Sequence, residues 1–133
     1  MQKDGLEKTL EEIFRERADV LYRTGESLSR ALKKLDAIAK VIDNNMECIK
    51  TFHGEEKSGN IEKLYTETNK AISKHNRARE YARLRYHYLI ITREAMGFRR
   101  HTWVEETYRI PPKIKHLDMA YAQVQQTENP DDQ

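Results

Sequence analysis

The fold is decided by residues 14–52, which read FRERADVLYRTGESLSRALKKLDAIAKVIDNNMECIKTF. Read in sevens, the stretch has two columns of residues, three positions apart, and nine of the twelve residues in them are apolar. The first column holds Phe14, Leu21, Leu28, Leu35, Ile42 and Ile49, and the second holds Arg17, Thr24, Ala31, Ile38, Asn45 and Phe52. Alternating spacings of four and three are typical of a helix that packs lengthwise against another helix. At about 1.5 Å per residue the seam is roughly 58 Å long, too long for one face of a small globule.

The first helix is predicted to run from about residue 4 to residue 52. Asp4 can cap its first turn, because a carboxylate there accepts hydrogen bonds from the first free backbone N–H groups. Gly25 is the weak point, since glycine inside a helix costs about 1 kcal/mol relative to alanine. The seven-residue register nevertheless continues from Leu21 to Leu28 without a skip. We therefore expect one continuous helix rather than a split pair.

A turn and a second long helix follow. Residues 53–60 read HGEEKSGN, a composition typical of a turn. The helix predicted at 61–97 carries a thinner seam than the first. This seam comprises Ile61, Leu64, Thr68, Ala71, His75, Ala78, Ala82, Arg85, Leu89, Thr92 and Met96. A short turn between two long helices predicts an antiparallel hairpin.

The later half of the second helix has a further apolar face. Leu84, Ile91 and Phe98 are spaced by seven and point about 140–180° away from His75, well off the first seam. A helix that is apolar on two sides is covered on two sides. We therefore expect another segment to pack on this face.

The C-terminal quarter is expected to supply that cover. Thr102 and Glu105 have capping-box spacing and predict a short helix over 102–109, which ends before Pro111. An apolar stripe predicts a last amphipathic helix over 113–126, packed on the hairpin; the stripe holds Ile114, Leu117, Tyr121 and Val124. Residues 127–133 are expected to be a flexible tail. The prediction is an all-α, coiled-coil-like antiparallel hairpin with one short helix and a C-terminal helix, a single domain over residues 1–126.

Composition limits the class of protein. The 133 residues are 35% charged and 38% hydrophobic, with five glycines and three prolines, which is the balance of a helix-rich, well-solvated chain. No apolar run is longer than that of Tyr88–Ile91, which is far short of the roughly 20 residues that span a bilayer. A single cysteine, Cys48, cannot form an internal disulfide. We expect a cytoplasmic protein with no membrane partner.

Basic charge is concentrated in residues 70–101, which hold nine Lys or Arg against two Glu. The flanking regions 1–69 and 102–133 are mildly acidic. On a helical wheel seven basic and tyrosine residues of the stretch fall within an arc of about 80°. They are Lys70, Lys74, Arg77, Tyr81, Arg85, Tyr88 and Arg99. Such a strip suits phosphate contacts and base stacking. The alternative is a solvated flank that faces acidic residues of the first helix, such as Asp36, Asp43 and Glu47.

No motif indicates catalysis, a cofactor or a small-molecule substrate. No Glu or Asp lies three residues before a histidine, so the Glu-x-x-His element of di-iron bundles is missing. His87 and His101 would lie about 21 Å apart on a continuous helix, so no metal site is predicted. Pairing of Arg93 with His101 in a nuclease-like site is a distant alternative. We expect a non-enzymatic protein.

The predicted function is a helical protein-interaction module: an adaptor, chaperone-like protein or assembly factor that associates with itself or with another protein. Its expected interface comprises Leu84, Ile91, Phe98, Trp103, Tyr108 and Ile110. Aromatic and arginine side chains in the segment 103–114 are of the kind that anchor interfaces. An equally weighted reading has Trp103 and Tyr108 plugging the end of the bundle. The alternative function is nucleic-acid binding through the strip in residues 70–101.

Overall fold

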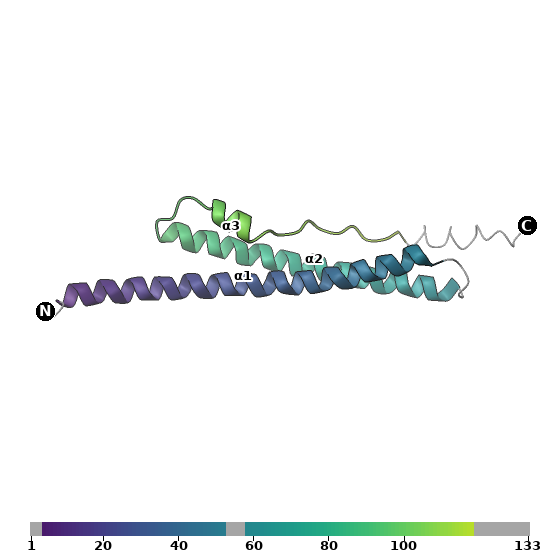
Figure 1. Ribbon diagram of the computed structural model, residues 1–133, viewed down its shortest axis with the longest axis horizontal. Coiled ribbons are helices and arrows are strands. Elements are labelled where there is room, and N and C mark those ends of the chain that lie inside the picture. Colours follow the sequence, from purple (N-terminus) through teal and green to yellow (C-terminus); the bar gives the residue numbers. More distant parts are fainter. Residues whose placement is uncertain (1–3, 53–57, 119–133) are drawn as a thin grey trace, which may run out of the picture. The chain divides into compact units, whose positions relative to one another are not determined.

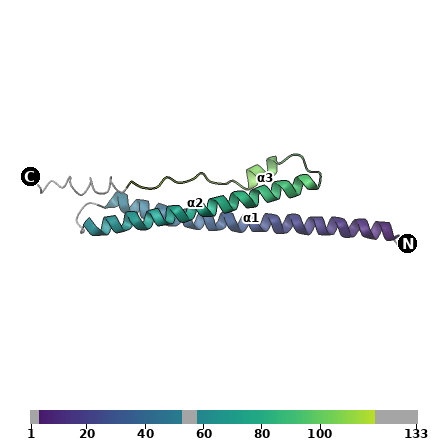
Figure 2. The ribbon, with the colours of Figure 1, turned by 180° about the vertical axis from the view of Figure 1, so that it is seen from behind.

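The computed structural model describes residues 4–52 and 58–118. This part of the chain forms three helices, α1 (Gly5–Thr51), α2 (Ser58–Ala95) and α3 (Thr102–Thr107), and contains no strand (Figure 1). The two long helices pack together as an antiparallel hairpin, which Figure 2 shows from behind. The predicted all-α hairpin is confirmed.

The start and the continuity of α1 follow the sequence prediction. The Glu7 backbone N–H donates to Asp4 Oδ1 at 2.8 Å, so Asp4 caps the helix as expected. The helix passes through Gly25 without a break. A Cβ at Gly25 would lie 3.2 Å from the Tyr108 hydroxyl oxygen. Glycine therefore leaves room for the tyrosine at this point of α1.

The second helix differs from its predicted bounds at both ends. It begins at Ser58, three residues before the predicted start, so residues 58–60 belong to the helix rather than to the turn. The rest of the predicted turn, 53–57, lies outside the described residues. At the other end, Gly97 has φ of +95° and its N–H bonds to the Glu94 carbonyl, while the Phe98 N–H bonds to the Arg93 carbonyl. This pair of bonds is a Schellman cap with glycine in the left-handed position.

The described residues fall into two compact units, of which the first combines residues up to 33 with residues 80–111. Its core is formed by Leu28 of α1, Leu89 of α2 and Val104 of α3. Half-buried apolar side chains surround this core: Leu21, Leu32, Tyr86, Ile90 and Tyr108. Val104 is the α3 side chain that packs into this core between residues of α1 and α2.

The start of α3 differs from the sequence prediction. His101, not Thr102, is the N-cap residue, and no side-chain hydrogen bond caps the helix. The predicted Thr102–Glu105 capping box is therefore wrong. The helix ends at Thr107, two residues earlier than predicted.

The second unit combines residues 34–79 with residues from 112 onward. Its α1–α2 seam buries Leu35, Ile38 and Ile42 of α1 and Ile72 of α2. Near the turn a second cluster forms around Ile61 and Tyr65, with Ile49, Phe52 and Leu117 packed against it.

The predicted C-terminal helix over 113–126 is wrong for residues 113–118, which are not helical; residues 119–126 and the predicted tail lie outside the described residues. The segment runs as an extended chain along α2 (Figure 1). Asn76 and Asn69 bond to the backbone of Ile114 and Leu117, which uses backbone groups that a helix would need. The side chains of Ile114 and Leu117 pack on the cluster of Ile38, Ile42 and Ile72 rather than on the predicted face.

Candidate protein-interaction surface

Large apolar side chains remain exposed along α2 and α3 in the first unit. On α2 they are Tyr81, Leu84, Tyr88 and Ile91, here called the outer strip. Their exposed fractions are 48%, 48%, 49% and 59%. Spacings of three, four and three place them on one helical face, roughly opposite the buried Ala82 and Leu89. The predicted cover by residues 113–126 is not found among the described residues.

Arg85 flanks the outer strip on the side toward the buried face of α2. Its guanidinium carbon is 4.9 Å from the ring centroid of Tyr81 and 5.9 Å from that of Tyr88. Residues three and four apart on a helix are neighbours, so one arginine reaches both rings. Its Nε atom is buried without a hydrogen-bond partner among the described residues. Arg85 is therefore within cation–π distance of both tyrosine rings.

The other predicted interface residues divide between surface and core. Phe98 and Trp103 are 46% and 60% exposed, whereas Tyr108 and Ile110 are half-buried. The Trp103 and Tyr108 rings meet edge to face, with centroids 6.0 Å apart. Tyr108 packs on the core beside Gly25, whereas Trp103 faces outward.

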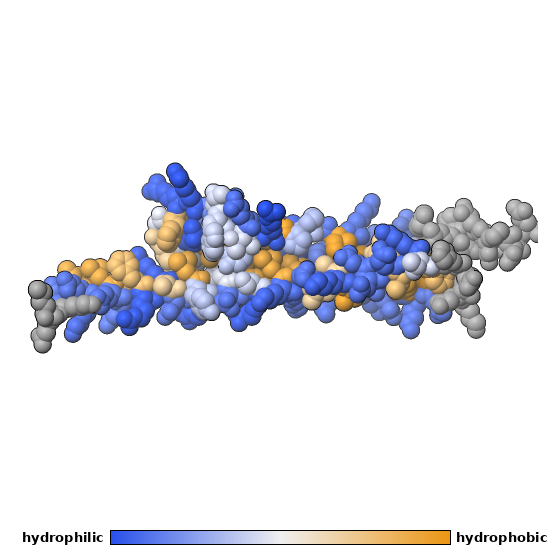
Figure 3. Space-filling model, viewed as in Figure 1, coloured by the Kyte–Doolittle hydropathy of each residue, from blue (hydrophilic) through white to orange (hydrophobic). Residues whose placement is uncertain are grey.

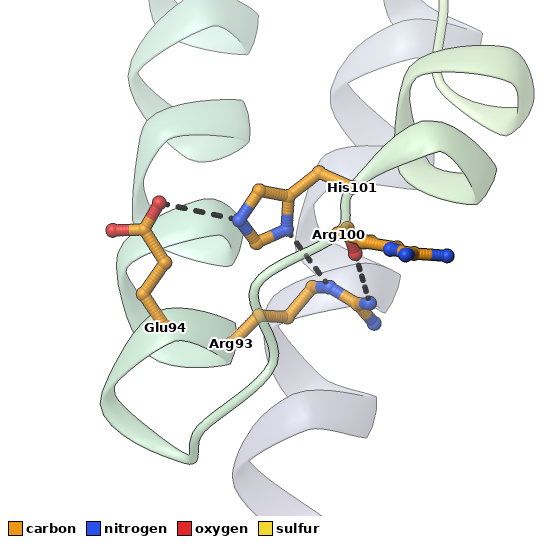
Figure 4. Close-up of polar contacts among 4 residues, drawn as sticks. All are labelled: Arg93, Glu94, Arg100 and His101. Carbon is orange, nitrogen blue, oxygen red and sulfur yellow. Dashed lines mark hydrogen bonds and ion pairs between the residues drawn. The ribbon is translucent and has the colours of Figure 1, made fainter.

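The reversal between α2 and α3 is held by polar contacts (Figure 4). Arg93 Nε donates to His101 Nδ1 at 3.4 Å, and Arg93 Nη2 donates to the Arg100 carbonyl at 3.1 Å. His101 Nε2 lies 3.2 Å from Glu94 Oε1. Since Nδ1 accepts from Arg93, the imidazole proton belongs on Nε2, where it is donated to Glu94. The Arg93 guanidinium also lies over the Phe98 ring, 4.8 Å from its centroid.

Phe98 and Arg99 do not continue the helical faces on which they were predicted, because α2 ends at Ala95. Both follow the Gly97 turn. The turn nevertheless leaves Phe98 exposed, in the same unit as the outer strip.

The remaining predicted nucleic-acid residues are dispersed between the two units. Lys70, Lys74 and Arg77 are exposed in the second unit. In the first unit Arg85 is engaged by the tyrosines. Of the acidic residues considered as internal partners, Asp36 and Glu47 pair with Lys40 and Lys50 of α1 itself.

The phenol of Tyr86, which packs against the core of the first unit, has a perturbed pKa. Burial, reinforced by the nearby Glu105 carboxylate, raises the pKa of Tyr86 above 10.0.

The distant nuclease alternative pairs Arg93 with His101, and these two side chains are in contact. Both ring nitrogens of His101 are engaged by Arg93 and Glu94, so the contact serves to hold the turn. Over the described residues no three His, Cys, Asp or Glu side chains come together as a metal site.

Two features escaped the sequence analysis. Asn69 and Asn76 are spaced by seven, a signal that marks one helical face, yet their bonding to an extended chain has no local signature. The first turns of α1 carry exposed apolar residues, which are Leu6, Leu10, Ile13, Phe14 and Val20 and are here called the N-terminal stripe. The predicted seam begins at Phe14 and contains none of Leu6, Leu10, Ile13 and Val20.

Over the part of the chain that the structure describes, no helix is both long enough and apolar enough to span a bilayer. The chain matches no protein-family model, no curated protein and no solved structure.

Proposed function

We propose that this protein is a non-enzymatic helical interaction module, an adaptor or assembly factor that self-associates and binds a second protein through the outer strip, Phe98 and Trp103. The observation that carries the proposal is the exposure of the outer strip on a helix whose opposite face is already buried. An isolated exposed leucine is ordinary, but a contiguous apolar strip is characteristic of interaction sites.

The spacing of the outer strip specifies the kind of partner. Tyr81, Leu84, Tyr88 and Ile91 follow the three-four spacing of a helix seam, so the best-fitting partner is an amphipathic helix laid along α2. Arg85 fixes the tyrosine rings, which lowers the side-chain entropy lost on binding. Trp103 adds an aromatic anchor of the type enriched at binding hot spots.

The test is a pull-down from the native cell with the full chain as bait, with and without nuclease. Leu84→Asp combined with Ile91→Asp places charges in the outer strip. Val41→Asp is the matched control, because Val41 is also an exposed apolar residue on a long helix. We expect proteins that survive nuclease treatment, are retained by the control and are lost with the double variant. Retention by the double variant would contradict the proposal.

A second candidate function is polyanion binding, favoured by the exposure of Lys70, Lys74 and Arg77 on α2. Lysine and arginine contacts to phosphates release counterions, so such binding weakens steeply with salt. The test is retention of mixed single- and double-stranded oligonucleotides by the wild type and by Lys74→Glu with Arg77→Glu. Salt-sensitive retention that the charge reversal removes would support this function, and no retention at low salt would eliminate it.

A further inference from the structure

The N-terminal stripe lies on a part of α1 that has no cover. Every residue from Gly5 to Val20 is exposed. Leu6, Leu10, Ile13 and Val20 share one helical face, with Phe14 on its flank, and Figure 3 shows an apolar band along the beginning of α1. The same face continues along the helix to the buried Leu28 and Ala31. The stripe is therefore an extension of the seam that α1 already buries.

The point at which α2 ends explains why the stripe is bare. Leu28 of α1 packs with Leu89 of α2, so in an antiparallel pair Ala95, the last residue of α2, lies level with about Tyr22, and the α1 residues before it extend past α2. Isolated helices of roughly this length are marginal in water. Residues 5–20 are sixteen exposed helical residues, five of them with large apolar side chains. A partner would bury these side chains and stabilise this part of the helix.

The charges on this part of α1 are self-complementary in one orientation. Residues 4–12 hold Asp4, Glu7, Glu11 and Glu12 against Lys8, a net charge of −3. Residues 15–23 hold three arginines against two acids, a net charge of +1. A parallel pair of these helices would set −3 against −3, whereas an antiparallel pair sets −3 against +1. The antiparallel arrangement is electrostatically favoured.

Arg17 supports the same orientation. It lies on the face of the N-terminal stripe, about 20° from Leu6 on a helical wheel. In a parallel pair each Arg17 would face the other Arg17. In an antiparallel pair centred near Phe14, each Arg17 would instead lie level with residues 10–12 of the second copy, within the segment of net charge −3.

We infer that a second copy of this chain covers the N-terminal stripe with its own stripe, antiparallel, about a twofold axis near Phe14. This inference rests on the self-association in the proposed function and names the surface that performs it. A twofold contact of this kind is self-complementary and closes as a dimer. It leaves the outer strip free for a different protein.

The first test is light scattering of the full chain across micromolar concentrations. The wild type is expected to be a dimer. Leu10→Asp with Ile13→Asp should raise the dimer dissociation constant by at least about 100-fold, because it places four charges in one apolar contact. Circular dichroism checks that the variant stays helical. Val41→Asp and the outer-strip variant Leu84→Asp with Ile91→Asp should both remain dimeric.

The second test fixes the orientation by disulfide cross-linking in a Cys48→Ser background, since the native thiol is exposed. Phe14→Cys should cross-link to itself, because it lies near the proposed axis. Leu6→Cys should not, because its two copies would lie roughly 25 Å apart. Leu6→Cys is itself part of the stripe, so its dimeric state is checked by light scattering.

Three outcomes would overturn the inference: a monomeric wild type, a Leu10→Asp/Ile13→Asp variant that stays dimeric, or efficient cross-linking of Leu6→Cys to itself. A dimer lost only in the outer-strip variant would place self-association on α2 instead. Failure of the proposed binding function is a separate result. It would appear in the pull-down, as other proteins that the Leu84→Asp/Ile91→Asp variant still retains.

Discussion

The carboxamide of Asn76 forms two hydrogen bonds with the backbone of Ile114. Its Nδ2 donates to the Ile114 carbonyl at 2.9 Å, and its Oδ1 accepts from the Ile114 N–H at 3.0 Å. Asn69 repeats the arrangement with Leu117, at 3.0 and 2.7 Å. Seven helical residues rise about 10.5 Å and three extended residues span roughly 10 Å, so the two asparagines match the spacing of two backbone sites. Residues 113–118 are thereby held through backbone hydrogen bonds, which do not depend on the identity of most of their side chains.

Loss of an asparagine should loosen this segment. Asn76→Ala removes two partly buried hydrogen bonds and leaves the Ile114 backbone groups unpaired, so we expect a loss of about 1–3 kcal/mol in the free energy of unfolding. Urea denaturation measures it. Trypsin cleavage after Lys113 or Lys115 in the folded protein should accelerate. The control is Asn44→Ala, an exposed asparagine on α1; equal behaviour of the two variants would refute the role of Asn76.

The packing of α3 depends on Val104, which is fully buried between α1 and α2. Val104→Ala removes two carbon atoms and leaves a small cavity, which should lower the free energy of unfolding by roughly 2 kcal/mol. Val41→Ala, on an exposed site of α1, should change it by less than about 0.5 kcal/mol. Thermal or urea unfolding compares the pair. Similar losses in both would mean that α3 does not contribute to the core.

The end of α2 depends on the left-handed backbone of Gly97. Gly97→Ala forces a Cβ into that conformation and should cost on the order of 1–2 kcal/mol. Gly59 lies within α2, and a Cβ there meets nothing within 4 Å, so Gly59→Ala should be neutral or slightly stabilising. If urea unfolding shows the Gly97 variant to be as stable as the wild type, the Schellman cap is not needed to end the helix.

The raised pKa of Tyr86 predicts alkaline sensitivity. The folded state holds the phenol proton more tightly than the unfolded state, so its contribution to stability is complete below pH 10 and is lost as pH rises through the folded-state pKa. Unfolding measured between pH 8 and pH 11 should show a steeper decline for the wild type than for Tyr86→Phe. Parallel pH profiles would contradict the prediction. Glu105→Gln should also make the loss of stability with pH shallower, but by less than Tyr86→Phe does, because burial contributes more than Glu105 to the raised pKa.

The hairpin was predictable because its information is periodic and local. Leu28, Leu35 and Ile42 form a seven-residue column, and the structure buries all three. Asp4 as a cap and Gly97 as a terminator depend on short-range backbone chemistry, which the sequence also displays. The point along α1 at which the seam stops being buried was not predictable from the pattern. Phe14 follows the column yet is exposed, because the end of α2 is set by Gly97 and not by the pattern in α1.

The C-terminal segment shows a different limit. Ile114 and Leu117 are three residues apart, a spacing that puts side chains on one face both in an α-helix and in an extended chain with three residues per turn. The apolar pattern therefore does not discriminate between the two. Asn69 and Asn76 decide the conformation from more than 37 positions away in the chain, and that pairing has no local signature.

The candidate surface was predicted in part. Leu84, Ile91 and Trp103 are exposed as an interface requires, but Tyr81 and Tyr88 were assigned to nucleic-acid binding and lie in the same strip. The sequence shows that these four α2 residues share a face. It does not show that Arg85 would stack on both rings, because that depends on side-chain conformation.

The most direct measurement of the central claim uses Trp103, the single tryptophan of the chain. Incorporation of 5-fluorotryptophan gives one ¹⁹F signal, and a soluble paramagnetic agent reports its solvent exposure. Adding the protein recovered in the nuclease-treated pull-down should shift this ¹⁹F signal and reduce the relaxation enhancement that the paramagnetic agent causes. In the Leu84→Asp/Ile91→Asp variant, the added protein should have neither effect. A bound partner that leaves the signal and its enhancement unchanged would contradict the assignment of this surface.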